Sequence, residues 1–226
     1  MISLRNVTLS HRELPVLRDA TLAIERGDVV LLTGETGAGK TTLLRALYGD
    51  LPVSAGRIEV DGVTLDGPAG RGIPKLRRRM GLIFQDDKLL EDRTVYDNIR
   101  FALSIQLNSS RDITRRSLTI LAELGLSHLR SQMPTQLSAG EAQRIGIARA
   151  LANDPIIILA DEPTGDLDAS TAHEIFAYLA RHHTPERTFI IATHDPERAR
   201  EAFPNARHLH LERGRIGEIR DMKYER

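Results

Sequence analysis

A glycine-rich segment at residues 34–41 has residue types and spacing suited to phosphate chemistry. It reads Gly-Glu-Thr-Gly-Ala-Gly-Lys-Thr and fits the pattern GxxxxGK[ST]. Its glycines allow backbone N–H groups to converge on phosphate oxygens, and a following helix presents its positive end to the same anion. Lys40 would then neutralise the β- and γ-phosphates, and the Thr41 hydroxyl would ligate Mg²⁺. The predicted phosphate-binding residues are Gly34, Glu35, Thr36, Gly37, Ala38, Gly39, Lys40, Thr41 and Thr42.

The alternative for this segment is a plain glycine-rich turn between a strand and a helix. An apolar run at 29–33 precedes the segment, and a good helical stretch at 41–48 follows it. Phosphate binding requires that order of elements. The sequence therefore favours a triphosphate site over a turn.

A second candidate is the acidic pair Asp161 and Glu162, which ends the apolar run 156–160. A carboxylate at the C-terminal edge of a parallel strand lies where phosphates bind in such sheets. Asp161 is expected to hold Mg²⁺ through water, because Mg²⁺ keeps much of its hydration. Two acids after a strand can also begin a solvated helix, and the glycine-rich segment makes the metal site the better interpretation.

The third candidate is the segment Ser138, Ala139, Gly140 and Glu141, which opens a predicted helix. Free N–H groups and a serine hydroxyl at a helix start can bind an anion. Simple capping of the helix by Ser138, with Glu141 completing a capping box, explains the same residues. The two interpretations are compatible.

The elements that position these residues alternate along the chain. Short strands are expected at 2–9, 20–24, 29–33, 80–84, 156–160 and 188–192, with helices at 41–48 and 169–181. The turn Asp61-Gly62 predicts a hairpin of 56–60 with 63–65, and 206–211 with 215–219 predicts a closing hairpin. Residues 94–153 change to helical spacing. Strands that alternate with helices imply a parallel sheet, and the helical insertion implies a second lobe.

Composition limits the class of protein. Hydrophobic residues make up 41% of the 226, which is enough for a real core. The net charge is zero, so no global field draws the chain to nucleic acid or to an anionic membrane. Cysteine is absent, which excludes disulfides and thiolate metal sites. The first residues lack a secretory signal, and no apolar run approaches the ~18 residues that span a bilayer, so a soluble chain is expected.

Residues 137–151, LSAGEAQRIGIARAL, followed by IIILADEP at 156–163, resemble the ATPase subunits of ATP-binding cassette (ABC) systems. The resemblance implies a P-loop (RecA-like) core with a mostly parallel sheet, an N-terminal antiparallel β subdomain and an inserted α-helical subdomain. It implies one ABC domain over 1–226, with 1–85 and 154–226 as the nucleotide-binding core and 86–153 as the helical subdomain. It also implies ATP hydrolysis, with ATP and Mg²⁺ bound.

The same resemblance assigns roles to single residues. It makes Glu162 the general base, lets His194 contact the γ-phosphate, and gives Gln85 a place on Mg²⁺. Lys40 joins Glu162 and His194 in catalysis. Asp168 lies in a loop, residues 165–168, that resembles the family's interface loop. His11 stands where the family usually has an aromatic residue that stacks on adenine.

In that family two copies enclose two ATP molecules head to tail, so an ATP-dependent homodimer is implied. The segment at Ser138, Ala139, Gly140 and Glu141 would then meet the γ-phosphate held by the other copy. Two departures stand out: Ala139 replaces the first glycine of the usual LSGGQ or LSGGE, and His11 offers less stacking area than tyrosine. We expect modest ATP affinity and weak discrimination between nucleotide bases. The catalytic pair Asp161 and Glu162 is unaffected by either departure.

Residues 76–98 resemble the FtsE/FtsX family of bacterial cell-division complexes. This implies an FtsX-like integral membrane subunit that docks near Gln85 to Asn98, control of cell-wall hydrolysis, and a cytoplasmic position on the inner face of the membrane without insertion. A solvated face is the alternative for the basic run 75–79. An ATPase of a lipoprotein or macrolide exporter, or a soluble ABC ATPase acting on DNA or ribosomes, are the alternative functions; no nucleic acid is expected.

Overall fold

The computed structural model describes residues 1–11, 14–65, 70–86, 88–165 and 167–219. Its centre is a six-stranded sheet in the order β10-β9-β3-β8-β7-β6. The parallel strands are β3 (Val29–Gly34), β6 (Met80–Ile83), β7 (Ile157–Asp161), β8 (Thr188–Ala192) and β9 (Arg207–Glu212), and β10 (Arg215–Ile219) pairs antiparallel with β9. All five residues of β8 are buried. Short continuous apolar runs of this kind suit strands that are covered on both faces.

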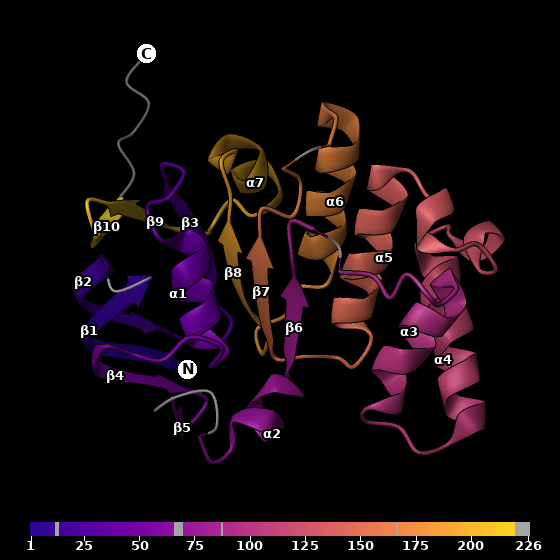
Figure 1. The fold of residues 1–226 in the computed structure, drawn as a ribbon. Coiled ribbons are helices and arrows are strands. Elements are labelled where there is room, and N and C mark those ends of the chain that lie inside the picture. The colour runs from indigo at the N-terminus through magenta and orange to yellow at the C-terminus, as the bar shows by residue number, and fades with distance from the viewer. Residues whose placement is uncertain (12–13, 66–69, 87, 166, 220–226) are drawn as a thin grey trace.

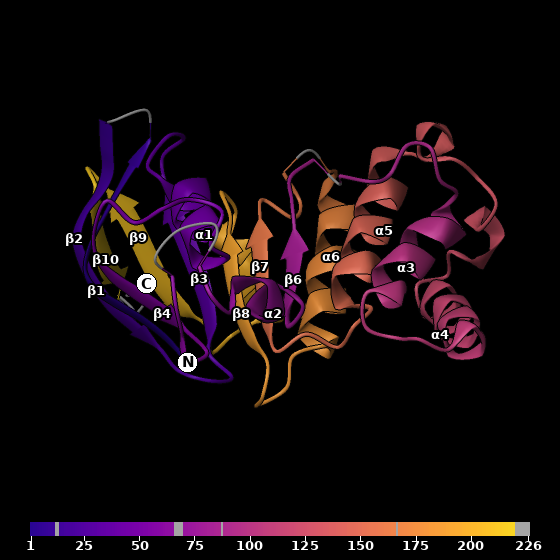
Figure 2. The same cartoon turned by 60° about the horizontal axis from the view of Figure 1, so that its bottom comes forward.

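A second, antiparallel sheet has the order β2-β1-β4-β5. Its strands are β1 (Ile2–His11), β2 (Leu14–Ile24), β4 (Ala55–Val60) and β5 (Val63–Thr64). On β1 the apolar side chains Ile2, Leu4, Val7 and Leu9 are buried, because they face the cluster that also contains α1 (Lys40–Leu47). Figures 1 and 2 show this sheet at one end of the molecule, with α1 between it and the central strands.

Helices occupy the opposite end of the molecule (Figures 1 and 2). The helical block consists of α3 (Val95–Ser104), α4 (Ser110–Glu123), two 3-10 turns (Ser127–Leu129 and Pro134–Gln136) and α5 (Ala139–Leu151). It has its own apolar cluster, separate from the two clusters that pack on the six-stranded sheet. The other helices within the described residues are α2 (Ile73–Arg77), α6 (Ala169–Arg181) and α7 (Pro196–Ala202).

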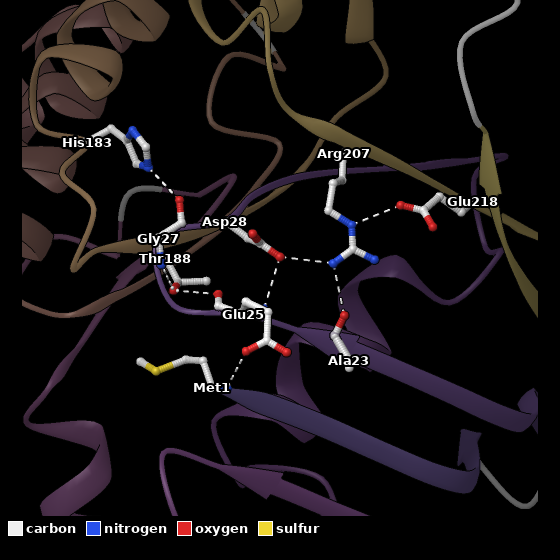
Figure 3. A network of polar contacts seen from close by, with 9 residues as sticks. All are labelled: Met1, Ala23, Glu25, Gly27, Asp28, His183, Thr188, Arg207 and Glu218. Atoms are coloured by element: carbon white, nitrogen blue, oxygen red, sulfur yellow. Dashed lines mark hydrogen bonds and ion pairs between the residues drawn. The ribbon is translucent and has the colours of Figure 1, made fainter.

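A polar network around Arg207 ties the two sheets together at the N-terminal ends of β3, β8 and β9 (Figure 3). The Arg207 guanidinium donates hydrogen bonds to Asp28 and Glu218, both at 2.9 Å, and to the carbonyl of Ala23 at the end of β2. Asp28 also accepts from the backbone N–H of Glu25 at 3.0 Å. The network therefore joins β2, β9 and β10 through a single side chain.

The predicted α/β class, the antiparallel N-terminal sheet and the inserted helices are confirmed. The hairpin at Asp61-Gly62 is confirmed as well, since both residues have positive φ, 48° and 77°. Three details differ: β2 begins at Leu14 rather than at residue 20, and α2 and α7 were not expected. None of the helices in the described ranges is long and apolar enough to cross a membrane.

Candidate active site

The glycine-rich loop follows β3 directly and leads into α1. Gly34 has φ 147°, and a Cβ there would lie 2.4 Å from the carbonyl oxygen of Leu211, so no side chain fits. Gly39 caps α1 in the left-handed region, with φ 107°. These two glycines bend the backbone so that the N-terminal end of α1 faces the loop, as phosphate binding requires.

Lys40, the first residue of α1, folds back over the loop. Its side chain is only 7% exposed, and its Nζ donates to the carbonyls of Gly34 at 2.8 Å and Glu35 at 3.4 Å. The same Nζ lies 3.3 Å from His194 Nε2 and 3.8 Å from Glu162 Oε1. The ammonium group is thus held where the loop, the end of β7 and the end of β8 meet.

The acidic pair lies at the end of β7, as the sequence predicted for phosphate chemistry. Burial raises the pKa of the Asp161 carboxyl, opposed by a hydrogen bond with the Thr41 side chain and by the charge of Lys40. Glu162 has left-handed backbone, with φ 47°, and its N–H donates to the carbonyl of Ala192 on β8. This turn directs Asp161 toward the loop and Glu162 toward His194.

The two oxygens of the Glu162 carboxylate have different surroundings. Oε2 accepts from the backbone N–H of His194 at 3.0 Å. Among the described residues Oε1 is buried without a hydrogen-bond partner, although His194 Nε2 at 3.1 Å and Lys40 Nζ at 3.8 Å lie in ion-pair range. Burial raises the pKa of Glu162, against the opposing effect of the His194 N–H. A buried acceptor with a raised pKa and an open lone pair is the group that a general base needs.

One cavity of about 330 Å³ brings most of the predicted residues together. The site residues predicted from sequence that line this cavity are His11, Thr36, Gly37, Gly39, Lys40, Thr41, Thr42, Gln85, Asp161, Glu162 and His194. His11 is exposed at the end of β1 and pairs with Leu14 across the sheet. Among the described residues, the predicted loop members Gly34, Glu35 and Ala38 do not line this cavity, and neither do these predicted residues outside the loop: Ser138, Ala139, Gly140, Glu141 and Asp168.

The five residues outside the loop that do not line the cavity lie at the starts of α5 and α6. Ser138 and Glu141 form the predicted capping box: Glu141 Oε2 accepts from the Ser138 N–H at 2.8 Å and from its hydroxyl at 2.7 Å. These bonds, the backbone one first, hold the pKa of Glu141 below its usual value. Gly140 allows α5 to approach α6, because a Cβ there would lie 3.0 Å from Thr171 Cγ2. Ala139 is the first helical residue and its side chain is exposed.

Gln85 and Asp168 are each two residues away from a position outside the described part of the chain. Gln85 is exposed two residues after β6 and borders both the 330 Å³ cavity and a neighbouring cleft of about 580 Å³. Asp168 caps α6 by accepting from the N–H groups of Ser170 and Thr171. Two members of the predicted docking and interface segments, Asp87 and Asp166, fall outside the described residues.

The donor set at the cavity fits Mg²⁺. The Thr41 side chain hydrogen-bonds to Asp161, and the Gln85 amide borders the same space. These are oxygen ligands, which Mg²⁺ prefers, and one carboxylate with substrate phosphates is its usual set. No group of three or more His, Cys, Asp or Glu side chains gathers as a metal site in the described ranges.

A family model described as ABC transporter matches residues 17–165. The chain belongs to the ABC transporter family. The cell division ATP-binding protein FtsE of Mycobacterium tuberculosis is 40% identical over 197 residues, 86% of each chain. The lipoprotein-releasing system ATP-binding protein LolD of Porphyromonas gingivalis is 39% identical over 201 residues, 88% of this chain and 92% of that one. The dimeric, post-hydrolysis structure of the ATP-binding cassette MJ0796 with ADP and Pi superimposes with TM-score 0.87 at 30% identity, over 98% and 100% of the two chains.

As a member of the ABC transporter family with this likeness to a cassette, the chain binds nucleotide and hydrolyses ATP. The P-loop architecture predicted for it is confirmed by the same likeness. Two cavity-lining residues were not predicted, Val16 and Arg45. Helical spacing from Thr41, four residues earlier on α1, would have indicated Arg45. Val16 gave no signal, because it lies in the part of β2 that was not expected to be a strand.

Proposed function

We propose that this ABC ATPase works as a pair of copies that drive an integral membrane partner of the FtsX kind, in a complex that controls cell-wall hydrolysis during division. The chain would sit at the inner face of the cell membrane through that partner. Within it, residues 86–153 would act as the helical subdomain, and 1–85 with 154–226 as the nucleotide-binding core. The observation that carries the catalytic part is the convergence of Lys40, Glu162 and His194 on one cavity.

Glu162 is the proposed general base. Its Oε1 is a buried acceptor that no described residue hydrogen-bonds, so it can take a proton from a water positioned beside the γ-phosphate. The His194 N–H fixes the other oxygen at 3.0 Å, and the His194 ring stands next to the open one. Lys40 would leave the Gly34 carbonyl to neutralise the β- and γ-phosphates of ATP.

Thr41, Asp161 and Gln85 are the proposed Mg²⁺ residues. When bound, the ion neutralises phosphate charge as ATP is cleaved. The hydrogen bond of Thr41 with Asp161 already places a hydroxyl and a carboxylate side by side at the edge of the cavity. The adenine would stack on the exposed ring of His11, which borders the same cavity.

The second copy would supply Ser138, Ala139, Gly140 and Glu141 to the γ-phosphate, and Asp168 to the interface. Two observations support this. These residues lie at the starts of α5 and α6, where backbone N–H groups are free to bind an anion, and they do not line the cavity of their own chain. Cassette MJ0796, to which this chain is similar over 98% of its length, is described as a dimer.

The membrane partner is proposed to dock near residues 85–98. FtsE of Mycobacterium tuberculosis, named for cell division, is among the relatives, and residues 76–98 are the part of the sequence that we identified as resembling the FtsE/FtsX family. The Arg93 guanidinium lies 5.1 Å from the centre of the Phe101 ring, which is 43% exposed, so a cation and an apolar face lie together beside the segment. The likeness to LolD keeps a lipoprotein-releasing role as the second candidate.

The catalytic proposal is tested with Glu162→Gln. This change keeps the shape of the side chain and removes the base, so the ATP turnover number should fall by about a hundredfold or more while ATP binding is retained. Turnover and the Kd of a fluorescent ATP analogue are measured with the partner present. Equal turnover in both proteins would refute the assignment of Glu162.

The partner is tested by recovery of the membrane subunit from native membranes. The double charge reversal Asp92→Arg with Arg93→Asp should lower that recovery and leave ATP binding intact. The matched control reverses another exposed pair, Asp112 and Arg115 on α4, whose atoms lie 2.8 Å apart. Equal recovery with both variants would remove the proposed docking surface, and recovery of a lipoprotein transporter subunit would favour the second candidate.

A further inference from the structure

Gln143 is a buried polar residue on α5 that the proposed mechanism does not use. Its side chain is 4% exposed. One and two helical turns further on, Ile147 and Leu151 pack into the cluster of the six-stranded sheet, so Gln143 is the first member of the stripe that faces the core. On another side of α5, Ile145 and Ala148 pack into the helical block. Packing alone would place an apolar residue at position 143.

The Gln143 amide bonds to two loops at once. Its Nε2 donates to the carbonyl of Pro163 at 2.9 Å and to the carbonyl of Phe84 at 3.4 Å. An amide nitrogen carries two hydrogens, so one side chain can serve both acceptors. Pro163 follows Glu162 directly, and Phe84 directly precedes Gln85. Both bonded carbonyls are therefore one residue from a residue of the active site.

The position of these bonds is the second observation. The cleft of about 580 Å³ between the helical block and the core is lined by Gln143 together with Gln85, Ala139, Glu162 and Gly165. The apolar clusters on its two sides are separate. α5 contributes Ile147 to one cluster and Ile145 to the other, so packing fixes the middle of this helix to both units. Its first turn, which lines the cleft, depends on more specific contacts. A buried hydrogen bond across such a cleft is costly to lose, because it leaves the carbonyls without a donor.

We propose that Gln143 is a positioning residue that holds the start of α5 in fixed relation to the two loops carrying Gln85 and Glu162. A displacement of the Ser138 end of α5, when it meets a phosphate on the other copy, is then passed to the catalytic carboxylate within the same chain. Gln143 touches neither substrate nor metal in this scheme. The inference rests on the proposed roles of Ser138, Gln85 and Glu162.

The first experiment compares Gln143→Leu with Asn153→Leu. Asn153 makes a similar amide bond, 2.7 Å to the carbonyl of Ala102, but within the helical block and away from the site. Misplacement of a catalytic group lowers the rate more than the binding, so Gln143→Leu should lower kcat for ATP by about tenfold or more with KM changed by less than about twofold. Asn153→Leu should match its loss of thermal stability and keep the wild-type kcat. Equal kcat values in the two variants would overturn the proposal.

The second experiment measures geometry without turnover. The chain has no cysteine, so Thr119→Cys on α4 and Glu186→Cys on the core can carry a pair of spin labels. In the nucleotide-free, full-length protein, Gln143→Leu should broaden the label-to-label distance distribution, whereas Asn153→Leu should leave it at the wild-type width. A wild-type width in Gln143→Leu would overturn the proposal. If Gln143→Leu does not fold, Gln143→Met replaces it, since methionine has similar reach but donates no hydrogen bond.

The two experiments separate this inference from the proposed function. A broadened label-to-label distance distribution in Gln143→Leu, together with equal turnover in wild type and Glu162→Gln, would support the positioning role of Gln143. It would also refute the catalytic assignment of Glu162. The opposite pair of results is a loss of turnover in Glu162→Gln, together with a wild-type kcat and a wild-type distance distribution in Gln143→Leu. It would support the proposed function and refute the positioning role of Gln143.

Discussion

The two ends of the six-stranded sheet differ in how their charged side chains are hydrogen-bonded. At the N-terminal ends of β3, β8 and β9, Arg207 is bonded to two carboxylates and a backbone carbonyl (Figure 3). At the C-terminal ends of β3, β7 and β8, Glu162 Oε1 is buried and has no hydrogen-bond partner in the described part of the chain. Both ends belong to the same sheet, yet the carboxylates at the first end accept hydrogen bonds from Arg207, whereas at the second end Glu162 Oε1 has cations nearby but no hydrogen bond from a described residue.

The difference shows which end stabilises the fold and which one is kept for chemistry. A buried or half-buried ion that is fully paired and hydrogen-bonded lowers the cost of its own desolvation. An open acceptor raises that cost and, in exchange, is available to a reacting water. Removing charge should therefore destabilise the first end and stabilise the second.

The largest expected effect is at the Arg207 end. Arg207→Ala removes the guanidinium that Asp28 and Glu218 share, so the free energy of unfolding should fall by about 2 kcal/mol. This figure is already reduced for the partial exposure of these groups. The control is Arg213→Ala in the same hairpin, where the arginine is 91% exposed and should cost less than about 0.5 kcal/mol. Denaturant unfolding of both variants measures the difference, and equal losses would contradict the role of the network.

At the other end we expect the opposite sign. The folded pKa of Glu162 is raised by burial, so the folded state binds its proton more tightly than the unfolded state, and this group costs stability once pH exceeds the folded pKa. Glu162→Gln should therefore unfold at higher denaturant than wild type near neutral pH. The gain should shrink as pH is lowered through the folded pKa of Glu162. The exposed Glu186→Gln serves as control, and a Glu162→Gln protein less stable than wild type at neutral pH would contradict the comparison.

The smallest effect concerns the cap of α5. Ser138→Ala removes the hydroxyl of the capping box and should cost about 1 kcal/mol, the usual value for an N-cap. Thr94→Ala removes the same kind of cap from α3, where Thr94 accepts from the N–H of Asp97 at 3.1 Å. Both should lose similar stability, but only Ser138→Ala should weaken ATP-dependent dimerisation, measured by light scattering. Equal dimerisation in both would leave Ser138 as a cap alone.

Local sequence rules were sufficient for the elements that carry the site. The phosphate loop was predictable because Gly34 and Gly39 need conformations that few other residues adopt, and β8 because the four apolar residues from Phe189 to Ala192 suit a strand that is covered on both faces. The capping box at Ser138 and Glu141 was predictable because its two partners are three residues apart in sequence. Each of these signals lies within one short window.

Elements defined by partners far away in sequence were missed. Residues 14–19 of β2 look unlike a strand, since Arg18 and Asp19 interrupt the alternation, yet pairing with β1 extends the strand to Leu14. The helices α2 and α7 are five and seven residues long, too short to show a helical period.

The sequence by itself thus determined the kinds of elements, their order, and the chemistry of the loop, the acidic pair and the capped helix. Tertiary structure decided which side chains meet: Lys40 with Glu162, Arg207 with Asp28 and Glu218, and Gln143 with the carbonyls beside Gln85 and Glu162. The physical reason is that backbone preference and periodicity act between near neighbours in the chain. Burial, pKa shifts and open acceptors depend on groups that only folding brings together.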